Sequence, residues 1–511
     1  SDAEIKPFRN KLLYNNPSQK TSVELAFREK NLFFIQGPPG TGKTTVIREL
    51  VDQVLESGKE SRVLIVSQAN VAVDTALKGL IEKYSNEIVR CGNGNKIQHE
   101  FQNLRLQKRC QEYLEQLEQR KNSFENSFYS EWEDTLLNES NEYSPVLCEL
   151  VIRSHRLIGA TCVGLAKRNI GLERTEFDLV IIDEAGKALP AELLIPLIRA
   201  KKAVIIGDQK QLPPVINPIL YDNERIDLEE RAVSENDLFT HSFFERIYDR
   251  APDTSKVMLD TQFRMPTIIG TAISHLFYED KLKNGVGTEN RQPILFDSNL
   301  TFINYDGNLS YRETKDEHHQ ISNEIEAHAV VPLVMSIREA NSKCKIAIIT
   351  PYKGQKRLIG DLLLAAGIRY QLENIYVDTI DAFQGSEAEV VIFCTTRAIV
   401  PTLFFKDSRR INVALSRVIQ ELIIIGRMGY FYKFNKNESC LPELADYIKA
   451  NGKVIPAKQC QVIQRKVEYH TEDVILLPLA EISLPNCFYT KELDDARIQR
   501  IIDEYYSNGD F

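Results

Sequence analysis

The sequence predicts an α/β protein with two parallel β-sheets, each covered by helices on both faces. Short runs rich in Ile and Val alternate with helix-forming stretches, and this pattern occurs in two successive sets. Most of these runs are apolar without alternation, which is typical of strands that helices cover on both faces. Two consecutive sets predict two lobes of similar architecture. The expected strands are Leu32–Gln36, Val63–Ser67, Leu157–Ala160, Leu179–Asp183 and Ala203–Gly207 in the first set, and Val257–Leu259, Ile346–Thr350, Ile375–Asp378, Val390–Cys394 and Leu422–Gly426 in the second.

The chain is also long enough for several domains. At 511 residues it exceeds what one hydrophobic core supports. We expect a first lobe at 1–255, a second lobe at 256–452 and a C-terminal extension of unknown role at 453–511. A charged stretch rich in Gln, Glu and Leu predicts a helical insertion at 98–153 within the first lobe.

Composition excludes some classes of protein. A net charge of −9 argues against a uniformly basic surface, although it leaves room for a local basic groove. Nine cysteines without a C-x-x-C pair argue against a metal ribbon and favour a reduced, intracellular compartment. No apolar run reaches 18 residues, so we expect no membrane span. The chain starts at Ser1 without Met, which leaves open whether it is an excised piece of a longer protein.

The strongest motif is GPPGTGKTT, which directly follows the first expected strand and precedes helix-forming residues. It matches the pattern G-x-x-x-x-G-K-[ST], whose backbone N–H groups and helix N-terminus bind phosphates. Lys43 is expected to reach the β- and γ-phosphates, and the Thr44 hydroxyl to hold Mg²⁺. The candidate nucleotide-binding residues here are Gly37, Pro38, Pro39, Gly40, Thr41, Gly42, Lys43, Thr44 and Thr45.

Two further strands end in polar residues that should face the same crevice. Val180–Ala185 reads VIIDEA, so Asp183 is expected to hold Mg²⁺ and Glu184 to act as the general base on the attacking water. GDQKQLPP follows the next strand, and its Gln211 is expected to sense the γ-phosphate. An ordinary turn remains the alternative for this last segment.

Two arginines in the second set are candidates for charge stabilisation. Arg264 lies in QFRMP and Arg417 ends RRINVALSR. An arginine delivered from a second lobe stabilises charge at a transferring phosphate. Taken singly, each arginine is better explained by a surface salt bridge.

Taken together and in this order, these strings resemble superfamily 1B helicases, the group of the nonsense-mediated-decay helicase, senataxin and the immunoglobulin-μ-binding helicase. The resemblance runs from about Asn15 to about Gly429. It implies two tandem RecA-like P-loop lobes with a helical insertion in the first, and an ATP- and Mg²⁺-dependent enzyme that moves 5′→3′ on single-stranded RNA or DNA. The motifs that carry it are IQGPPGTGKT, SQANVAVD, ATCVG, IIDEA, GDQKQLPP, QFRMP, ITPYKGQ, DAFQGSEAEVVI and RRINVALSR.

The resemblance also implies roles for single residues. Gln19 would read adenine, Tyr352 would stack near the base and Glu387 would contact the ribose, while Arg264 and Arg417 would face the γ-phosphate. The positions implied along the nucleic-acid track are Ser67, Asn70, Thr161, Thr350, Pro351 and Gln384. Lys353, Lys356, Arg397, Lys406 and Arg409 are candidates for a local positive groove.

The sequence departs from the family in two places. Helicases of this group usually carry a β-barrel before the phosphate loop, and only 36 residues precede Gly37 here. Lys187 stands where the family often has Gln. An ATP-gated clamp or remodeller without efficient unwinding therefore stays open as the alternative function. Three further questions stay open: whether the substrate is RNA or DNA, whether the insertion is structural or grips nucleic acid, and whether a protein partner binds through the C-terminal extension or through upstream domains. A GTPase is disfavoured because neither Asn-Lys pair fits N-K-x-D.

Overall fold

The computed structural model describes residues 7–8, 13, 16–121, 144–167, 172, 175–214, 242–317, 319–383 and 385–469. Residues 1–467 form one compact unit and 468–511 a second, and all but two residues of the second unit lie outside the described part. Gln384, most of the C-terminal extension and residues 122–143 of the expected insertion also lie outside it.

The first lobe is built on a parallel sheet of seven described strands in the order β3-β4-β2-β5-β6-β1-β7. Its strands are β1 (Leu32–Gln36), β2 (Val63–Ser67), β3 (Ile88–Arg90), β4 (Leu157–Thr161), β5 (Leu179–Asp183), β6 (Ala203–Gly207) and β7 (Lys256–Met258). Its helices are α2 (Pro17–Arg28), α3 (Lys43–Ser57), α4 (Asn70–Lys78), α5 (Ile81–Tyr84), α6 (Leu106–Lys121), α8 (Pro145–Ser154), α9 (Pro190–Leu197) and α11 (Phe243–Arg250).

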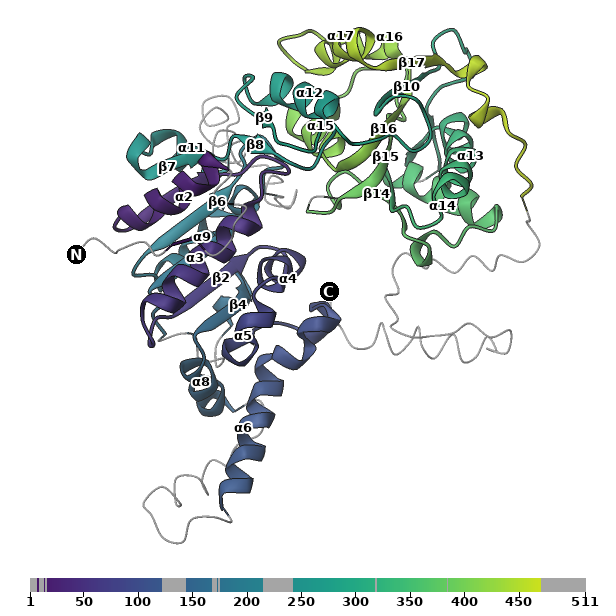
Figure 1. Cartoon of the computed structure of the whole chain (residues 1–511). Helices are drawn as coiled ribbons and strands as arrows, with labels where there is room; N and C mark the ends of the chain where they lie inside the picture. The colour runs from purple at the N-terminus through teal and green to yellow at the C-terminus, as the bar shows by residue number, and fades with distance from the viewer. Residues whose placement is uncertain are drawn as a thin grey trace, which may run out of the picture. The chain divides into compact units, whose positions relative to one another are not determined.

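Alternate residues of each strand enter two different cores. Phe33 and Ile35 of β1 pack with apolar residues of α2, α3 and α4, whereas Phe34 packs with those of α6, α8, α9 and α11. Helices therefore cover both faces of the sheet, which explains why its strands are apolar without alternation. Figure 1 shows α6, one of the described helices of the expected insertion, extending away from this sheet.

The second lobe is built on a parallel sheet of six described strands in the order β14-β13-β15-β16-β10-β17. Its strands are β10 (Leu300–Asn304), β13 (Ile346–Thr350), β14 (Ile375–Thr379), β15 (Ala388–Cys394), β16 (Val418–Gly426) and β17 (Lys453–Pro456). Its helices are α12 (Thr267–Phe277), α13 (Glu324–Ala340), α14 (Lys353–Ala365), α15 (Ser408–Leu415), α16 (Met428–Phe431) and α17 (Leu441–Asn451). Two short pairs of strands lie outside the sheet: β8 (Thr261–Gln262) with β9 (Lys283–Asn284), and β11 (Thr314–Lys315) with β12 (Ile321–Ser322).

The structure confirms the predicted class, an α/β protein with two parallel sheets, and corrects the placement of one strand. Val257–Leu259 was expected in the second sheet, but β7 pairs with β1 and so ends the first sheet. The exchange is physically simple, because the chain returns beside β1 before it enters the second lobe. The second sheet gains β10 and β17 instead, neither of which was expected.

Candidate functional site

The phosphate loop leaves β1 at Gln36 and enters α3 at Lys43. The Gly37 N–H donates to the Gly207 carbonyl of β6 at 2.9 Å, which ties the loop to the neighbouring strand. Gly42 caps α3 with φ 76°, in the left-handed region that favours glycine. The Lys43 Nζ donates to the Gly37 carbonyl at 2.8 Å, so the ammonium group lies across the loop. The N–H groups at the very start of a helix lack intrahelical acceptors, so an anion is favoured at the start of α3.

Gln19 lies against the same loop. It sits in the first turn of α2 and is 4% exposed, and its Nε2 donates to the Thr41 carbonyl at 2.7 Å. A side chain on Gly42 is excluded in this arrangement, because its Cβ would lie 2.3 Å from the Gln19 Nε2. The structure thus brings Gln19 to the phosphate loop, and its reading of adenine stays a prediction.

The two carboxylates follow β5, at the carboxyl end of the sheet beside the phosphate loop. Asp183 is the last residue of the strand, and its Oδ1 accepts the Glu184 N–H at 2.9 Å. Glu184 has φ 56°, which is uncommon outside glycine and found at functional sites. Burial, and next the charge of Glu184, raise the pKa of Asp183 to about 6, while the Lys43 ammonium acts in the opposite direction. Asp183, Glu184 and Lys43 therefore share one electrostatic environment.

This environment fits Mg²⁺. A divalent cation reduces the repulsion between a buried carboxylate and a second carboxylate beside it. A hydroxyl together with carboxylate oxygens is the donor set that Mg²⁺ prefers. The described residues contain no group of three or more His, Cys, Asp or Glu that would hold a metal unaided. Thr44 and Asp183 could thus hold the ion only together with water and nucleotide phosphates, which is the usual arrangement for Mg²⁺.

Gln211 connects the two lobes. Its Nε2 donates to the Asp208 Oδ2 at 2.6 Å, and its Oε1 accepts a hydrogen bond from the Arg417 Nη2 at 2.8 Å. Arg417 follows α15 in the second lobe and is 3% exposed. Burial, and next the charge of Arg264, lower the pKa of Arg417 to about 10. The structure therefore brings Gln211, Arg264 and Arg417 together, as the sequence predicted.

Sequence reasoning missed three residues of this network. Tyr278, which follows α12, donates from its hydroxyl to the Asp208 Oδ2 at 2.6 Å. Asn412 of α15 donates to that same hydroxyl at 3.0 Å and to the Lys210 carbonyl at 2.7 Å. Asp208 and Asn412 stand inside motifs already recognised, so their position was a usable signal. Tyr278 follows an apolar helix and carries no local signal.

Arg264 contacts Glu387. Its Nε lies 2.7 Å from the Glu387 Oε2, and its Nη1 donates to the Ser416 carbonyl at 3.3 Å. The neighbouring Phe263 N–H donates to the Gly40 carbonyl at 2.9 Å, so this segment is attached to the phosphate loop. Glu387 thus lies at the candidate site through an ion pair, and its contact with a ribose stays a prediction.

Lys187, the residue that departs from the family pattern, lies near Glu184, the expected general base. Burial lowers its pKa, and the charges of Glu184 and Arg417 act on it in opposite directions. Lys187 therefore interacts electrostatically with both the expected general base and the expected arginine.

The predicted track residues of the first lobe lie at the carboxyl ends of β2 and β4. Ser67 and Thr161 are register partners in these adjacent strands. Ser67 is fully buried, and its hydroxyl has no hydrogen-bond partner in the described part of the chain. The Thr161 hydroxyl accepts the Gly164 N–H at 3.0 Å, and Asn70 begins α4. The three residues share one edge of the sheet, and their contact with nucleic acid stays a prediction.

The predicted track residues of the second lobe lie at the end of β13. The buried Thr350 hydroxyl lies 3.1 Å from the hydroxyl of Thr396, and Pro351 is also buried. Tyr352 comes next, and its ring lies 5.9 Å from that of Phe404 and 5.8 Å from the Arg397 guanidinium. Among the described residues we find no contact between Tyr352 and the phosphate loop, so its stacking near a base stays a prediction.

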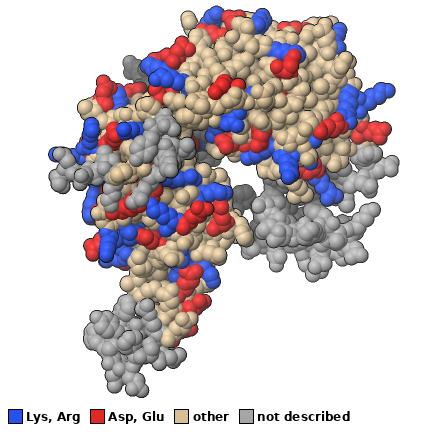
Figure 2. Space-filling view, in the orientation of Figure 1, with Lys and Arg blue, Asp and Glu red and all other residues tan. Residues whose placement is uncertain are grey.

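Four of the five basic residues expected to form a positive groove are paired with acids. The pairs are Lys356–Asp378 at 2.8 Å, Arg397–Glu313 at 3.5 Å, Lys406–Glu438 at 2.8 Å and Arg409–Asp407 at 2.8 Å. On the face in Figure 2, basic and acidic side chains are interspersed. The positive potential that these four residues offer to a phosphate backbone is reduced accordingly.

Two parallel sheets, a phosphate loop in the first lobe and a buried arginine of the second lobe hydrogen-bonded to Gln211 of the first define a nucleoside-triphosphatase with two lobes. Comparison with known proteins identifies the family. Two family models, both described as AAA domain, match the chain. One matches residues 15–144 and 112–217, and the other matches residues 239–429. The DNA polymerase alpha-associated DNA helicase A of Saccharomyces cerevisiae is 30% identical over 507 residues, which cover 87% of this chain and 71% of that protein. The chain belongs to the superfamily 1B helicases, a family of ATP-dependent enzymes.

Two further relatives match this chain over a smaller share of their own length. The ATP-dependent helicase upf1 of Schizosaccharomyces pombe is 31% identical over 440 residues, which are 80% of this chain and 44% of that protein. The 5'-3' DNA helicase ZGRF1 of Mus musculus is 28% identical over 416 residues, which are 78% of this chain and 21% of that protein. Among solved structures, the PRRSV helicase matches at a TM-score of 0.36 and 15% identity over 80% of this chain and 54% of that chain, a likeness too slight to argue from. No described helix is long and apolar enough to cross a bilayer.

Proposed function

We propose that the chain hydrolyses ATP between its two lobes and uses the energy to move 5′→3′ along single-stranded RNA or DNA. The observation that carries this proposal is the hydrogen bond between Arg417 of the second lobe and Gln211 of the first. Because Gln211 also binds Asp208, a change at the γ-phosphate would alter the contacts that join the lobes. Alternating closure and opening of two lobes is a known way to convert hydrolysis into movement.

Each part of the site would have one role. Lys43 and the loop N–H groups would bind the phosphates, and Glu184 would orient and deprotonate the attacking water. Arg264 and Arg417 would stabilise the charge on the transferring phosphoryl group. Thr44 and Asp183 would hold Mg²⁺, which neutralises charge on the phosphates when it is bound.

The domain division supports the same reading. We propose a first lobe that ends after β7, a second lobe that extends through β17, and an insertion that begins near Gln98. The proposed direction of movement is supported by family membership and by the name of the mouse relative, a 5'-3' DNA helicase. An intracellular location is proposed because six described cysteines are free and buried, namely Cys91, Cys162, Cys344, Cys394, Cys440 and Cys460. A protein partner bound through the C-terminal extension is proposed from its unassigned sequence alone.

The test is ATP turnover by the purified chain with matched RNA and DNA single strands, followed by strand separation on a duplex with a long 5′ overhang. We expect stimulation by single strands, and we expect Glu184→Gln to keep ATP binding while turnover falls to background. Glu192→Gln is the matched control, because that carboxylate accepts the Leu189 N–H at the start of α9. Stimulation without strand separation would favour the clamp or remodeller, and loss of ATP binding in Glu184→Gln would contradict the role of Glu184 as the base.

A further inference from the structure

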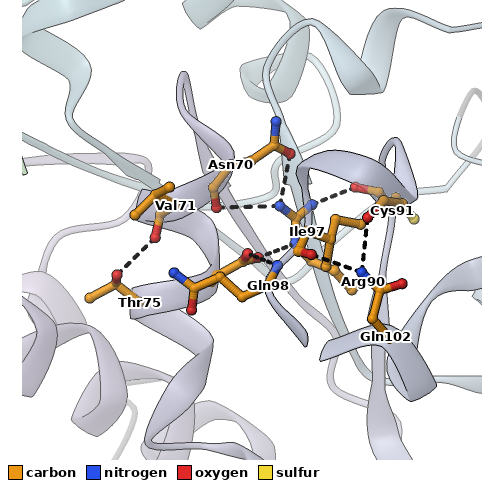
Figure 3. A network of polar contacts seen from close by, with 10 residues as sticks. Asn70, Val71, Thr75, Arg90, Cys91, Ile97, Gln98 and Gln102 are labelled. Carbon is orange, nitrogen blue, oxygen red and sulfur yellow. Dashed lines mark hydrogen bonds and ion pairs between the residues drawn. The ribbon is translucent and has the colours of Figure 1, made fainter. Parts of the chain in front are cut away.

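A buried arginine lies at the carboxyl end of β3, an edge strand of the first sheet. Arg90 is the last residue of β3 and has no exposed surface. Its Nε donates to the Asp74 Oδ1 at 2.6 Å, and its Nη1 donates to the Cys91 carbonyl at 2.5 Å. Its Nη2 donates to the Asn70 Oδ1 at 3.0 Å (Figure 3). Each of the three guanidinium nitrogens therefore donates to a different partner. Arginine provides this planar arrangement of donors and lysine does not.

The contact with Asn70 determines which way that side chain's amide points. A guanidinium can only donate hydrogen bonds, so the oxygen of the Asn70 amide must face it. The amide nitrogen then points away from Arg90, as Figure 3 shows. Asn70 begins α4 and is half-buried, so this nitrogen is a donor at the start of a helix whose first N–H groups also lack intrahelical partners. A phosphate is the ligand that such a set of donors favours.

Arg90 is itself held in place by charge and by space. Asp74 is as fully buried as Arg90 and compensates its charge, and the second oxygen of Asp74 accepts the Gln98 N–H at 3.0 Å. Gly92 leaves room for the arrangement, because a Cβ there would lie 3.2 Å from the Arg90 Nη1 and 3.5 Å from the Asn70 Oδ1. The direction of the Asn70 amide is therefore set by a rigid, fully paired group.

The same network reaches the start of the helical insertion. Gln102 donates to the carbonyls of Gly94 and Ile97, at 2.9 and 2.8 Å, and accepts a hydrogen bond from Arg105 at 3.2 Å. The helix α6 begins at the next residue. The segment that leads into the insertion is thus joined through Gln98 and Asp74 to the helix that carries Asn70.

We propose that Arg90 is a positioning residue for nucleic-acid binding, which fixes the Asn70 amide so that its Nδ2 is presented to a phosphate of the single strand. The inference rests on the proposed function, because it requires a strand along the carboxyl edge of the first sheet. Arg90 itself has no exposed surface and acts only through Asn70.

The test compares binding of the full chain to fluorescein-labelled oligothymidine and oligouridine by anisotropy. The variants are Asn70→Ala, Asn70→Asp, Arg90→Lys and the double variant Arg90→Lys/Asn70→Ala. Asn70→Asp keeps an acceptor for Arg90 and replaces only the outward donor by an oxygen, so it retains the buried network. Arg156→Lys is the matched control, because Arg156 makes a comparable set of bonds at the amino end of β4, to Ser61, Glu87 and Gly58.

We expect Asn70→Ala to weaken binding about tenfold, the effect of one hydrogen bond to a charged group. Asn70→Asp should be weaker still, because a carboxylate oxygen then faces the phosphate. Arg90→Lys should lose about as much as Asn70→Ala, and the double variant should lose no more than either single one. Arg156→Lys should stay within about twofold of the wild type.

Wild-type affinity in Asn70→Asp would overturn the proposal, since the outward atom would then not be a donor to phosphate. Losses that multiply in the double variant would also overturn it, because Arg90 would then act independently of Asn70. In both cases the wild-type chain still binds the strand, so the proposed function would stand. A wild-type chain that binds neither oligonucleotide would overturn both.

Discussion

The carboxyl edges of the two sheets hold their polar residues in different ways. At the first edge the buried charges of Arg90 and Asp74 are 2.6 Å apart and compensate each other. At the second edge the fully buried Glu326 accepts hydrogen bonds from three neutral donors: the Thr396 N–H at 3.0 Å, the Tyr311 hydroxyl at 3.0 Å and the Gln355 Nε2 at 3.1 Å. The polar residues of the first edge are thus held by an ion pair, and those of the second edge by hydrogen bonds to one buried acid.

The difference matters because each of these groups supports a predicted track residue. Arg90 orients Asn70, whereas Glu326 binds the backbone of Thr396, whose φ of 62° is uncommon for a β-branched residue and whose hydroxyl meets that of Thr350. Burial raises the pKa of Glu326 to about 7. An acid with this pKa changes its charge near neutral pH. We therefore predict that the hydrogen bonds of Glu326 at the second edge depend on pH.

The largest effect should come from breaking the contact that joins the edges. Arg417→Ala removes the hydrogen bond to Gln211 and the positive charge beside Glu184, so we expect ATP turnover to fall about 10³-fold or more. ATP binding and single-strand affinity should change far less, as measured by equilibrium titration. Arg338→Ala is the control, because Arg338 pairs with Glu373 on the surface of α13. A loss confined to single-strand affinity would instead assign Arg417 to the nucleic-acid track.

Much of the fold was predictable because its strands are uninterrupted β-branched runs, and such runs in two sets leave few alternatives. The missed strands were short or polar: β3 ends in Arg90, whose charge is acceptable inside only because Asp74 pairs with it, and β17 contains Pro456. The motifs predicted which residues meet at the site because strand ends of a parallel sheet share an edge. Sequence could not predict Tyr278 or Glu326, since each is defined by partners that are distant along the chain.

A second, smaller effect tests the pH difference directly. The pKa of Glu326 is raised, so between pH 4.5 and about 7 the folded state holds a proton that the unfolded state releases. The contribution of this group to the free energy of unfolding is therefore greatest at low pH and falls as pH rises through that window, by about 3 kcal/mol at roughly 1.4 kcal/mol per pH unit. Glu326→Gln removes this dependence.

Denaturant titrations at pH 5 and pH 8 measure the effect. Relative to the wild type, Glu326→Gln should gain up to about 3 kcal/mol between pH 5 and pH 8, whatever its absolute stability. Glu324→Gln on the same helix is the control, because that side chain is exposed and should leave the difference unchanged. A wild-type-to-variant difference for Glu326→Gln that is constant across pH would contradict the assignment of Glu326 as a group that titrates in this range.

The smallest effect concerns how each edge would bind the phosphate backbone. The first edge offers neutral groups such as Asn70, whereas the second carries lysines at the start of α14. Lys353 is exposed and has no ion pair in the described part of the chain, while Lys356 is paired with Asp378 at 2.8 Å. We expect Lys353→Gln to reduce the magnitude of the salt slope of single-strand binding by about 0.7, the value for one released counterion on a single strand.

Lys356→Gln should change this slope less, because its charge is already neutralised, and Asn70→Ala should weaken binding without changing it. Affinity measured against the logarithm of salt concentration separates the three variants. A slope reduced equally by Lys356→Gln would mean that the Lys356–Asp378 pair opens when the strand binds. A slope reduced by Asn70→Ala would mean that the first edge, and not only the second, displaces counterions from the backbone.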